Sequence, residues 1–316
     1  MLQKVVIIGA GSVGATFAYA LMQGGQAREI VFIDSNMERA KGEVMDLQHG
    51  LAFTRPVSIR YGDYPECANA DVVVVTAGAK QKPGESRLAL AGRNAEILKG
   101  IVPPVTGSGF GGVLLIVSNP VDVLTHIAWK ISGLPAGRVI GSGTVLDSAR
   151  LRSLLSEHCG VDARNIHAMI IGEHGDSEVA AWSLVSIGGV PIREYCRACS
   201  LYTDGKDHFQ ALFEEVKHAA YEIIIRKGAT FYAIGLALVQ ITDAILRDEH
   251  RVLPVSSVVQ GMYGMEETTI SLPSVIGKNG VERVLMPELE VTEVEALRKS
   301  AETINESVKI ILKSDI

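Results

Sequence analysis

A histidine lies in a polar turn that directly follows an apolar stretch of the chain. The turn reads Gly-Glu-His-Gly-Asp-Ser over residues 172–177 and places His174 at its centre. A neutral imidazole accepts a proton from an alcohol, the imidazolium returns it, and the ordinary pKa of histidine suits both steps. The position after a strand therefore indicates a general acid–base group, with an inert loop histidine as the alternative.

An acidic and a basic residue lie three positions apart on an expected helix. Asp147 and Arg150 are separated by about 60° around the helix axis, so both can face one cleft. A carboxylate orients an imidazole and stabilises its cation, and an arginine binds a substrate carboxylate through two parallel hydrogen bonds. The spacing alone favours an ordinary surface ion pair, so this alternative stays open.

A charged loop, Ala79–Arg87, follows an expected strand at 71–76. In a doubly wound sheet, loops at the carboxyl ends of strands border the ligand crevice. Pro83 and Gly84 suit a segment that closes over a ligand as a lid. Without further context, a solvated loop explains these residues equally well.

The first glycine-rich motif lies between an expected strand and an expected helix. Gly9, Gly11 and Gly14 form Gly-x-Gly-x-x-Gly, and Asp34 follows twenty residues after Gly14. The first glycine permits a tight turn, the second lets a pyrophosphate approach the backbone, and the third lets helix and strand pack closely. An acid at Asp34 binds ribose hydroxyls and repels a 2′-phosphate. The motif predicts NAD rather than NADP, and a plain strand–helix turn is the alternative.

Two other motifs have binding-site spacing in the wrong context. Residues 107–112 repeat the glycine spacing, but they follow Pro103 and Pro104 and lead into a strand, which predicts a flexible loop. Cys196 and Cys199 have redox or zinc-ligand spacing, but no second pair accompanies them, so we predict no metal site.

The first half alternates apolar β-branched runs with helical patterns. This β-α-β-α order predicts a parallel, doubly wound Rossmann sheet with right-handed crossovers. We expect strands at 5–8, 30–33, 71–76, 113–117 and 139–141, and helices at 13–23, 37–47, 88–101 and 121–131.

After residue 143 the pattern becomes that of an α+β domain, beginning with Thr144 as the N-cap of a helix. We therefore expect a NAD-binding domain over residues 1–143 and a catalytic domain over residues 144–316. Its expected elements are a helix to Gly160, a strand at 167–171, a helical region at 207–246 interrupted near Gly228, antiparallel strands at 256–259 and 268–276, and an amphipathic helix at 292–313.

Composition limits the possible partners. Thirty Lys and Arg residues against thirty-six Asp and Glu residues give a net charge of −6, which gives no electrostatic reason to expect nucleic acid or an anionic membrane. Glycines or prolines interrupt both long uncharged runs, so neither predicts a signal peptide or a spanning helix. Four cysteines in 316 residues form no disulfide framework. We expect a cytoplasmic protein.

Taken together, these motifs resemble the L-lactate/malate dehydrogenase family, in order and over essentially the whole chain. The resemblance implies an NAD-dependent oxidoreductase, and it favours the catalytic interpretation of the polar residues over the alternatives above. A retired, non-catalytic NAD-binding protein would have lost some of those residues. The matching segments are 9–14, Asp34, 81–87, 93–94, 118–122, 147–150, 172–177 and 227–230.

The resemblance also implies individual roles. His174 is the proton donor and acceptor, Asp147 its partner, Arg150 the clamp on the substrate carboxylate, and Arg87 the mobile cation that polarises the substrate carbonyl. Negative charge on that oxygen is stabilised by Arg87 and His174 in a site emptied of water. Thr230 forms a pocket wall. The implied cofactor contacts are Gly9, Gly11, Ser12, Val13, Gly14, Asp34, Thr76, Gly78, Asn119 and Ile234, with Asn119 also bonding the reacting oxygen.

One position bears on the substrate. Malate-specific relatives carry an arginine where this chain has Gln81. Beside a neutral amide, the second carboxylate of oxaloacetate would bring an unpaired charge into a closing pocket, which is costly. The resemblance therefore implies pyruvate and L-lactate, with oxaloacetate reduction as the alternative.

Arg152 and His167 match positions at which bacterial relatives bind fructose 1,6-bisphosphate at a subunit interface. Two-fold symmetry would present two such pairs to one doubly phosphorylated ligand. The first strand begins by Val5 and leaves no N-terminal arm, so we expect a homotetramer in equilibrium with dimers. Relatives that ignore this effector carry the same residues, so an ordinary interface is the alternative.

Overall fold

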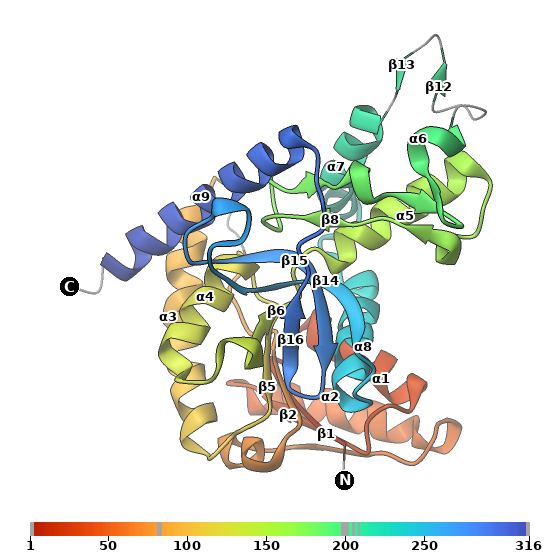
Figure 1. Ribbon diagram of the computed structural model, residues 1–316. Helices are drawn as coiled ribbons and strands as arrows, with labels where there is room; N and C mark the ends of the chain where they lie inside the picture. The colour runs from red at the N-terminus through yellow and green to blue at the C-terminus, as the bar shows by residue number, and fades with distance from the viewer. Residues whose placement is uncertain (1–2, 81–83, 197–201, 204–205, 208, 314–316) are drawn as a thin grey trace.

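The computed structural model describes residues 3–80, 84–196, 202–203, 206–207 and 209–313. Its main sheet has nine strands in the order β16-β15-β14-β6-β5-β4-β1-β2-β3 (Figure 1). From β3 to β6 all neighbours pair in parallel, which confirms the predicted Rossmann sheet. These six strands are β1 (Lys4–Ile8), β2 (Glu29–Ile33), β3 (Ser58–Tyr61), β4 (Val72–Val75), β5 (Val113–Ile116) and β6 (Val139–Gly141).

The strands of the parallel half are buried on both faces. Val5 and Ile7 of β1 pack with α1, α2 and α8 on one face, and Val6 and Ile8 pack with α3, α4 and α9 on the other. Helices from the second half thus complete both layers. The covering helices are α1 (Ser12–Gly24), α2 (Met37–His49), α3 (Arg87–Gly107), α4 (Val121–Ser132), α8 (Tyr232–Leu246) and α9 (Val291–Lys313).

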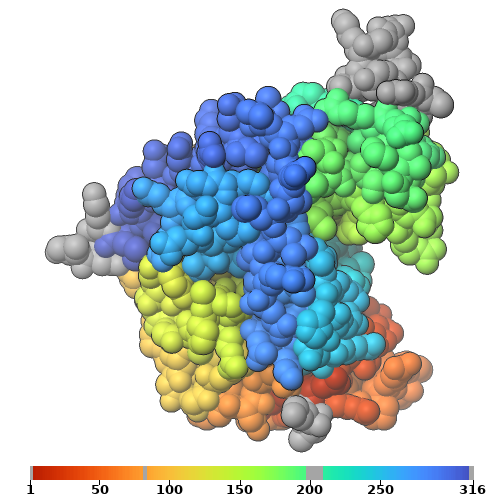
Figure 2. All heavy atoms as spheres, in the orientation of Figure 1, coloured from red at the N-terminus to blue at the C-terminus, as the bar shows by residue number. Residues whose placement is uncertain are grey.

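Three strands of the second half extend the same sheet, and its other strands form three small separate sheets. Strands β14 (Arg251–Val259) and β15 (Thr268–Gly277) are antiparallel, as predicted, and β14 joins β6 where Ser256 pairs with Gly141. An unpredicted strand, β16 (Gly280–Val284), forms the edge. In Figure 2 the beginning of the chain lies at the bottom of the view and the later segments lie above it.

A smaller core forms between α5 (Val145–Cys159) and α7 (Phe209–Lys227). Leu151 and Leu155 pack with Phe213 and Val216 across this contact. The predicted interruption near Gly228 is confirmed, because it separates α7 from α8. The short elements around this core are β7 (Ile166–His167), β8 (Ile170–Ile171), β9 (Val179–Ala180), β10 (Ser186–Ile187), β11 (Val190–Pro191), α6 (Ile192–Tyr195), β12 (Tyr202–Thr203) and β13 (Lys206–Asp207).

The helix expected to end at residue 101 is longer than predicted, because α3 continues through Pro103 and Pro104 to Gly107. The buried side chains of Val102 and Val105 pack into the core on the far side of the sheet from α1. The Thr106 hydroxyl also donates to the Val102 carbonyl (3.2 Å). Burial and this bond offset the loss of proline N–H groups, which by itself disfavours a helix interior.

Two smaller expectations also need correction. Thr144 is the N-cap residue of α5, as predicted, but its hydroxyl donates to the Ile170 carbonyl (2.5 Å) and makes no capping hydrogen bond to the helix. The strand expected at 167–171 is divided into β7 and β8, which pair with different partners. None of the helices in the described part of the chain combines the length and apolarity needed to cross a membrane.

Candidate active site

The glycine loop between β1 and α1 is shaped by close backbone contacts. Gly9 has φ +115°, and a Cβ there would lie 2.6 Å from the Ala77 nitrogen. A Cβ on Gly14 would lie 2.1 Å from the Gly9 carbonyl oxygen. By contrast, a Cβ on Gly11 would meet no atom of the described chain within 4 Å. The loop therefore leaves open space beside Gly11, which fits a group bound against the backbone.

An acidic side chain and a helix start complete this loop. Asp34 follows β2, and its carboxylate accepts hydrogen bonds from the Ala10 and Asn36 amides (2.6 and 2.8 Å). Gly11 is the N-cap of α1 without a side-chain cap, so the first amides of the helix, at Ser12 and Val13, face the open space. An open cradle, a helix N-terminus and an acid fit the pyrophosphate and adenosine ribose of NAD.

The other predicted cofactor residues lie at the ends of neighbouring elements. The Thr76 hydroxyl, just after β4, donates to the Gly9 carbonyl (2.8 Å). Gly78 packs against Ser118, since a Cβ added to Gly78 would lie 3.1 Å from the Cβ of Ser118. The carbonyl of Asn119 accepts from Asn94 Nδ2 (2.7 Å), and Ile234 is half-buried on α8. Thr76, Gly78 and Asn119 therefore lie beyond the carboxyl ends of the parallel strands β4 and β5.

One cavity brings together five of the predicted substrate and catalytic residues. They come from the start of α3, the β5–α4 link, the first two turns of α5 and the loop after β8. Thr230 lies in the link between α7 and α8 and does not line this cavity in the described structure, and Gln81 lies outside the described residues. The five residues are Arg87, Asn119, Asp147, Arg150 and His174.

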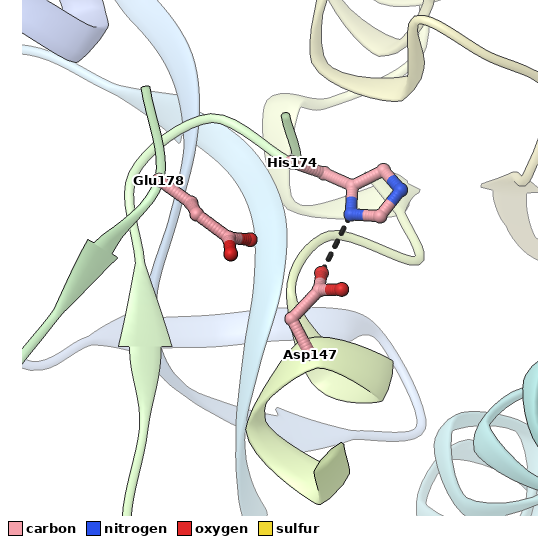
Figure 3. Close-up of side chains that lie close together, drawn as sticks. All are labelled: Asp147, His174 and Glu178. Atoms are coloured by element: carbon pink, nitrogen blue, oxygen red, sulfur yellow. Dashed lines mark hydrogen bonds and ion pairs between the residues drawn. The ribbon is translucent and has the colours of Figure 1, made fainter. Parts of the chain in front are cut away.

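The imidazole of His174 is held by a buried carboxylate. His174 Nδ1 lies 2.6 Å from Asp147 Oδ2, and the second ring nitrogen points away from Asp147 (Figure 3). Arg150 Nη1 donates to the other oxygen of Asp147 at 2.6 Å. The side chains of Asp147 and Arg150 are only 3% and 15% exposed, so theirs is not the surface ion pair weighed as the alternative.

The electrostatics of this pair favour a charged imidazolium. Burial lowers the pKa of His174, but the charge of Asp147 and the hydrogen bond to it raise that pKa more strongly, to about 9. Burial raises the pKa of Asp147, but the charge of His174, their hydrogen bond and the charge of Arg150 bring it below its usual value. The site can therefore hold a proton on His174 at neutral pH.

Arg87 is the first residue of α3, whose N-cap Ser86 accepts a hydrogen bond from the Ala89 amide (3.2 Å). Its guanidinium donates to Asp176 (3.1 Å) and to the Tyr221 hydroxyl (3.4 Å). The side chain is 42% exposed at the mouth of the cavity. Arg87 is thus a cation held loosely enough to exchange partners.

Sequence reasoning missed two buried acids beside His174. Asp122, 1% exposed, accepts from the His174 amide (2.7 Å) and the Ser256 hydroxyl (2.6 Å). Burial raises its pKa to about 7, against the effect of both hydrogen bonds. Glu178 is also buried and lines the cavity. The one available signal was an acid placed among residues expected to be buried, which is uncommon without a partner.

Two family profiles match the chain in succession. The lactate/malate dehydrogenase NAD-binding domain matches residues 3–141, and the lactate/malate dehydrogenase alpha/beta C-terminal domain matches residues 144–314. An L-lactate dehydrogenase of Acetivibrio thermocellus is 50% identical over 311 residues, which cover 98% of each chain. L-lactate dehydrogenase 1 of Clostridium acetobutylicum is 50% identical over 308 residues, again covering 98% of each.

Solved structures agree. A lactate dehydrogenase from a deep-sea metagenome library of the Medee basin superimposes with a TM-score of 0.94 at 46% identity, covering 98% of this chain and 99% of that one. The minor L-lactate dehydrogenase of Enterococcus mundtii, in a ligand-bound form, gives a TM-score of 0.93 at 44% identity and covers 98% of both chains. The likeness thus extends over both halves of the molecule.

Proposed function

This chain belongs to the lactate/malate dehydrogenase family, and from that premise we propose that it interconverts pyruvate and L-lactate with NAD. The observation that carries the proposal is the cavity in which His174 is fixed on Asp147 beside Arg150. Reduction of a 2-oxo acid requires a proton donor for the carbonyl oxygen and a cation that binds the carboxylate. We also place the division between the NAD-binding and catalytic halves at residue 143.

Each residue has a defined task in this proposal. When bound, NAD supplies or accepts the hydride. Arg150 binds the substrate carboxylate through paired hydrogen bonds, and Asn119 holds the reacting oxygen. The ring nitrogen of His174 that faces away from Asp147 gives its proton to that oxygen during reduction and takes it back during oxidation. Arg87 leaves Asp176 and stabilises the charge on the oxygen, and Thr230 closes the pocket.

The cofactor would be held mainly by backbone. Its pyrophosphate would lie against Gly11 and the first amides of α1, and its adenosine ribose against Asp34. The remaining contacts would come from the ends of β4, β5 and α8. They are Thr76, Gly78, Asn119 and Ile234, together with Gly9, Ser12, Val13 and Gly14 around the loop.

The proposal is tested by following NADH oxidation with a panel of 2-oxo acids. We expect pyruvate to have the highest kcat/KM and oxaloacetate to be a poor substrate. NADPH should be used far less well than NADH, because Asp34 repels a 2′-phosphate. A higher kcat/KM for oxaloacetate, or no turnover of any 2-oxo acid, would contradict the proposal.

We assign the preference for pyruvate over oxaloacetate to Gln81, because its neutral side chain would leave the second carboxylate of oxaloacetate without an opposite charge. Replacing Gln81→Arg should raise kcat/KM for oxaloacetate relative to pyruvate by about 100-fold, the equivalent of pairing one charge in a dehydrated pocket. Gln81→Asn, which stays neutral, is the control and should leave the preference for pyruvate. An unchanged preference in Gln81→Arg would remove this residue from specificity.

We further propose a homotetramer that fructose 1,6-bisphosphate stabilises through Arg152 and His167. Arg152 is half-buried on α5, with its Nε donating to the Ser148 carbonyl (3.4 Å), and His167 is exposed on β7, which packs against α5. The bisphosphate should lower KM for pyruvate and increase the sedimentation coefficient of wild type but not of Arg152→Gln. No response in wild type would make Arg152 and His167 ordinary interface residues.

A further inference from the structure

Glu178 lines the catalytic cavity and directly precedes β9 in the chain. It is only 7% exposed, and its side chain extends toward the His174–Asp147 pair (Figure 3). One carboxylate oxygen of Glu178, one of Asp147 and one ring nitrogen of His174 lie within 4.8 Å of one another. Two acids of the cavity lining, Asp147 and Glu178, therefore lie near His174, and a third acid, Asp122 of α4, accepts a hydrogen bond from its backbone amide. Of the three, only Asp147 is hydrogen-bonded to the ring.

One carboxyl oxygen of Glu178 lacks a hydrogen-bond partner in the described structure. Within the described part of the chain, no donor lies within hydrogen-bonding distance of the buried Glu178 Oε1. The charged groups that act on Glu178 are Asp147 and Arg150 of α5, His174 of its own loop and Lys217 of α7. Leaving a carboxyl oxygen buried without a partner costs stability, so a purely structural role explains this residue poorly.

We propose that Glu178 is a positioning residue for the acid–base step, a second carboxylate whose charge stabilises the His174 imidazolium. Because it acts through His174, the inference rests on the pyruvate/lactate activity proposed above. Its side chain makes no hydrogen bond to His174 or Asp147 in the described structure. Its contribution is electrostatic, and it changes with the protonation of Glu178 itself.

The ionisation of Glu178 overlaps that of His174. Burial first, and then the charge of Asp147, raise the pKa of Glu178 to about 8, close to the value of about 9 for His174. As pH rises, the negative charge that Glu178 gains makes the imidazolium harder to deprotonate. The enzyme thereby retains the proton needed for pyruvate reduction further into the alkaline range.

The test compares the pH profiles of wild type and Glu178→Gln, which keeps the shape and removes the charge. In pyruvate reduction, the alkaline fall of kcat/KM should move to lower pH by about one unit, which corresponds to one partly screened charge nearby. The acid limb of lactate oxidation should move in the same direction. The plateau rates should change by less than about threefold, because no group in contact with substrate is altered.

Two variants show whether charge is the cause. Glu178→Asp keeps the carboxylate and should restore most of the wild-type profile. Glu96→Gln makes the same chemical change at an exposed residue of α3 that pairs with Lys99 (2.7 Å), and its profile should match wild type. Profiles of Glu178→Gln and Glu178→Asp that are equally displaced would point to packing and overturn the proposal.

A measurement on the unmodified protein serves if Glu178→Gln does not fold. With histidine labelled with ¹⁵N and glutamate carboxyl groups labelled with ¹³C, the ring signals of His174 should show a small step at the pH at which the Glu178 carboxyl titrates, apart from any step caused by Asp122. No step in the His174 signals at that pH would overturn the inference. Failure of wild type to reduce pyruvate would instead overturn the proposed function, so the two failures are distinguishable.

Discussion

The glycine loop after β1 and the cavity around His174 are built on opposite principles. The loop depends on the absence of side chains, since a Cβ at Gly9 or Gly14 would overlap backbone atoms. The cavity depends on ionisable side chains: Asp147 and Glu178 line it, and the buried Asp122 holds the His174 amide. The comparison contrasts a proposed cofactor site formed mainly by backbone with a cavity formed by ionisable side chains.

This difference extends to pH. Backbone amides do not titrate, so the loop should hold its ligand similarly across the neutral range. His174 and Glu178 line the cavity and Asp122 contacts the His174 amide, and their pKa values, about 9, 8 and 7, lie near or above neutrality. Chemistry in the cavity should therefore depend on pH far more than cofactor binding does.

The largest expected effect separates the two sites completely. Replacing His174→Asn removes the proton donor but no part of the glycine loop. We expect kcat for pyruvate reduction to fall about 1000-fold, within the range for loss of a general acid, while NADH affinity measured by fluorescence titration stays within about twofold. If both quantities fell together, the separation of cofactor binding from chemistry would be wrong.

A smaller effect concerns the electrostatics of the cavity alone. Asp147 raises the pKa of His174, so Asp147→Asn should lower it. Pyruvate reduction needs the imidazolium, so the pH at which its rate falls on the alkaline side should be lower in Asp147→Asn than in wild type. Lactate oxidation needs the neutral imidazole, so its rate should rise at a lower pH than in wild type. We expect kcat/KM for pyruvate to fall by about 10- to 100-fold near neutral pH and more above it.

The control for this prediction is Asp162→Asn, which removes an exposed acid paired with Arg164 and remote from the cavity. Its pH profile should follow that of wild type. If the pH dependence of kcat/KM were the same in Asp147→Asn and in wild type, Asp147 would have no part in setting the charge of His174.

The two sites also differ in how far the sequence predicts them. The glycine loop and Asp34 are recognisable because strand, turn, helix and second strand follow one another within Lys4–Asp34. The cavity joins Asp147 to His174, 27 residues away, and Asp122 to the His174 amide, 52 residues away. Spacing alone favoured a surface ion pair for Asp147 and Arg150. Resemblance to a family supplied what local patterns could not.

Other differences from the prediction also arise from tertiary contacts. The helix α3 passes through Pro103 and Pro104 because Val102 and Val105 are buried on the sheet, and local propensity does not contain that information. The edge strand β16 has a half-exposed pattern and forms by pairing with β15. Glu178 escaped notice because its burial depends on α5 and α7 packing around it.

In the loop, the effect of a mutation should depend on which glycine changes. Gly14→Ala places a Cβ 2.1 Å from the Gly9 carbonyl and 2.9 Å from Thr76 Oγ1, so the free energy of unfolding should fall by about 1–3 kcal/mol through overpacking. Denaturant melts of the ligand-free protein measure this directly. Unchanged stability would mean that helix and strand are not as closely packed as the contact indicates.

Gly11→Ala should have the smallest and most informative effect. No atom of the described chain lies within 4 Å of a Cβ at this position, so the ligand-free protein should unfold within about 0.5 kcal/mol of wild type, as surface substitutions do. If NAD lies against this backbone, the same methyl group occupies its space, and KM for NADH should rise about tenfold or more. Gly92→Ala, in the interior of α3 and equally uncrowded, is the control for cofactor binding: it should leave KM for NADH unchanged, while alanine in a helix interior should raise the free energy of unfolding by about 0.5–1 kcal/mol. A Gly11→Ala enzyme with normal KM for NADH would show that the open space beside the loop is not where the cofactor binds, and the contrast between a shape-built and a charge-built site would lose its first half.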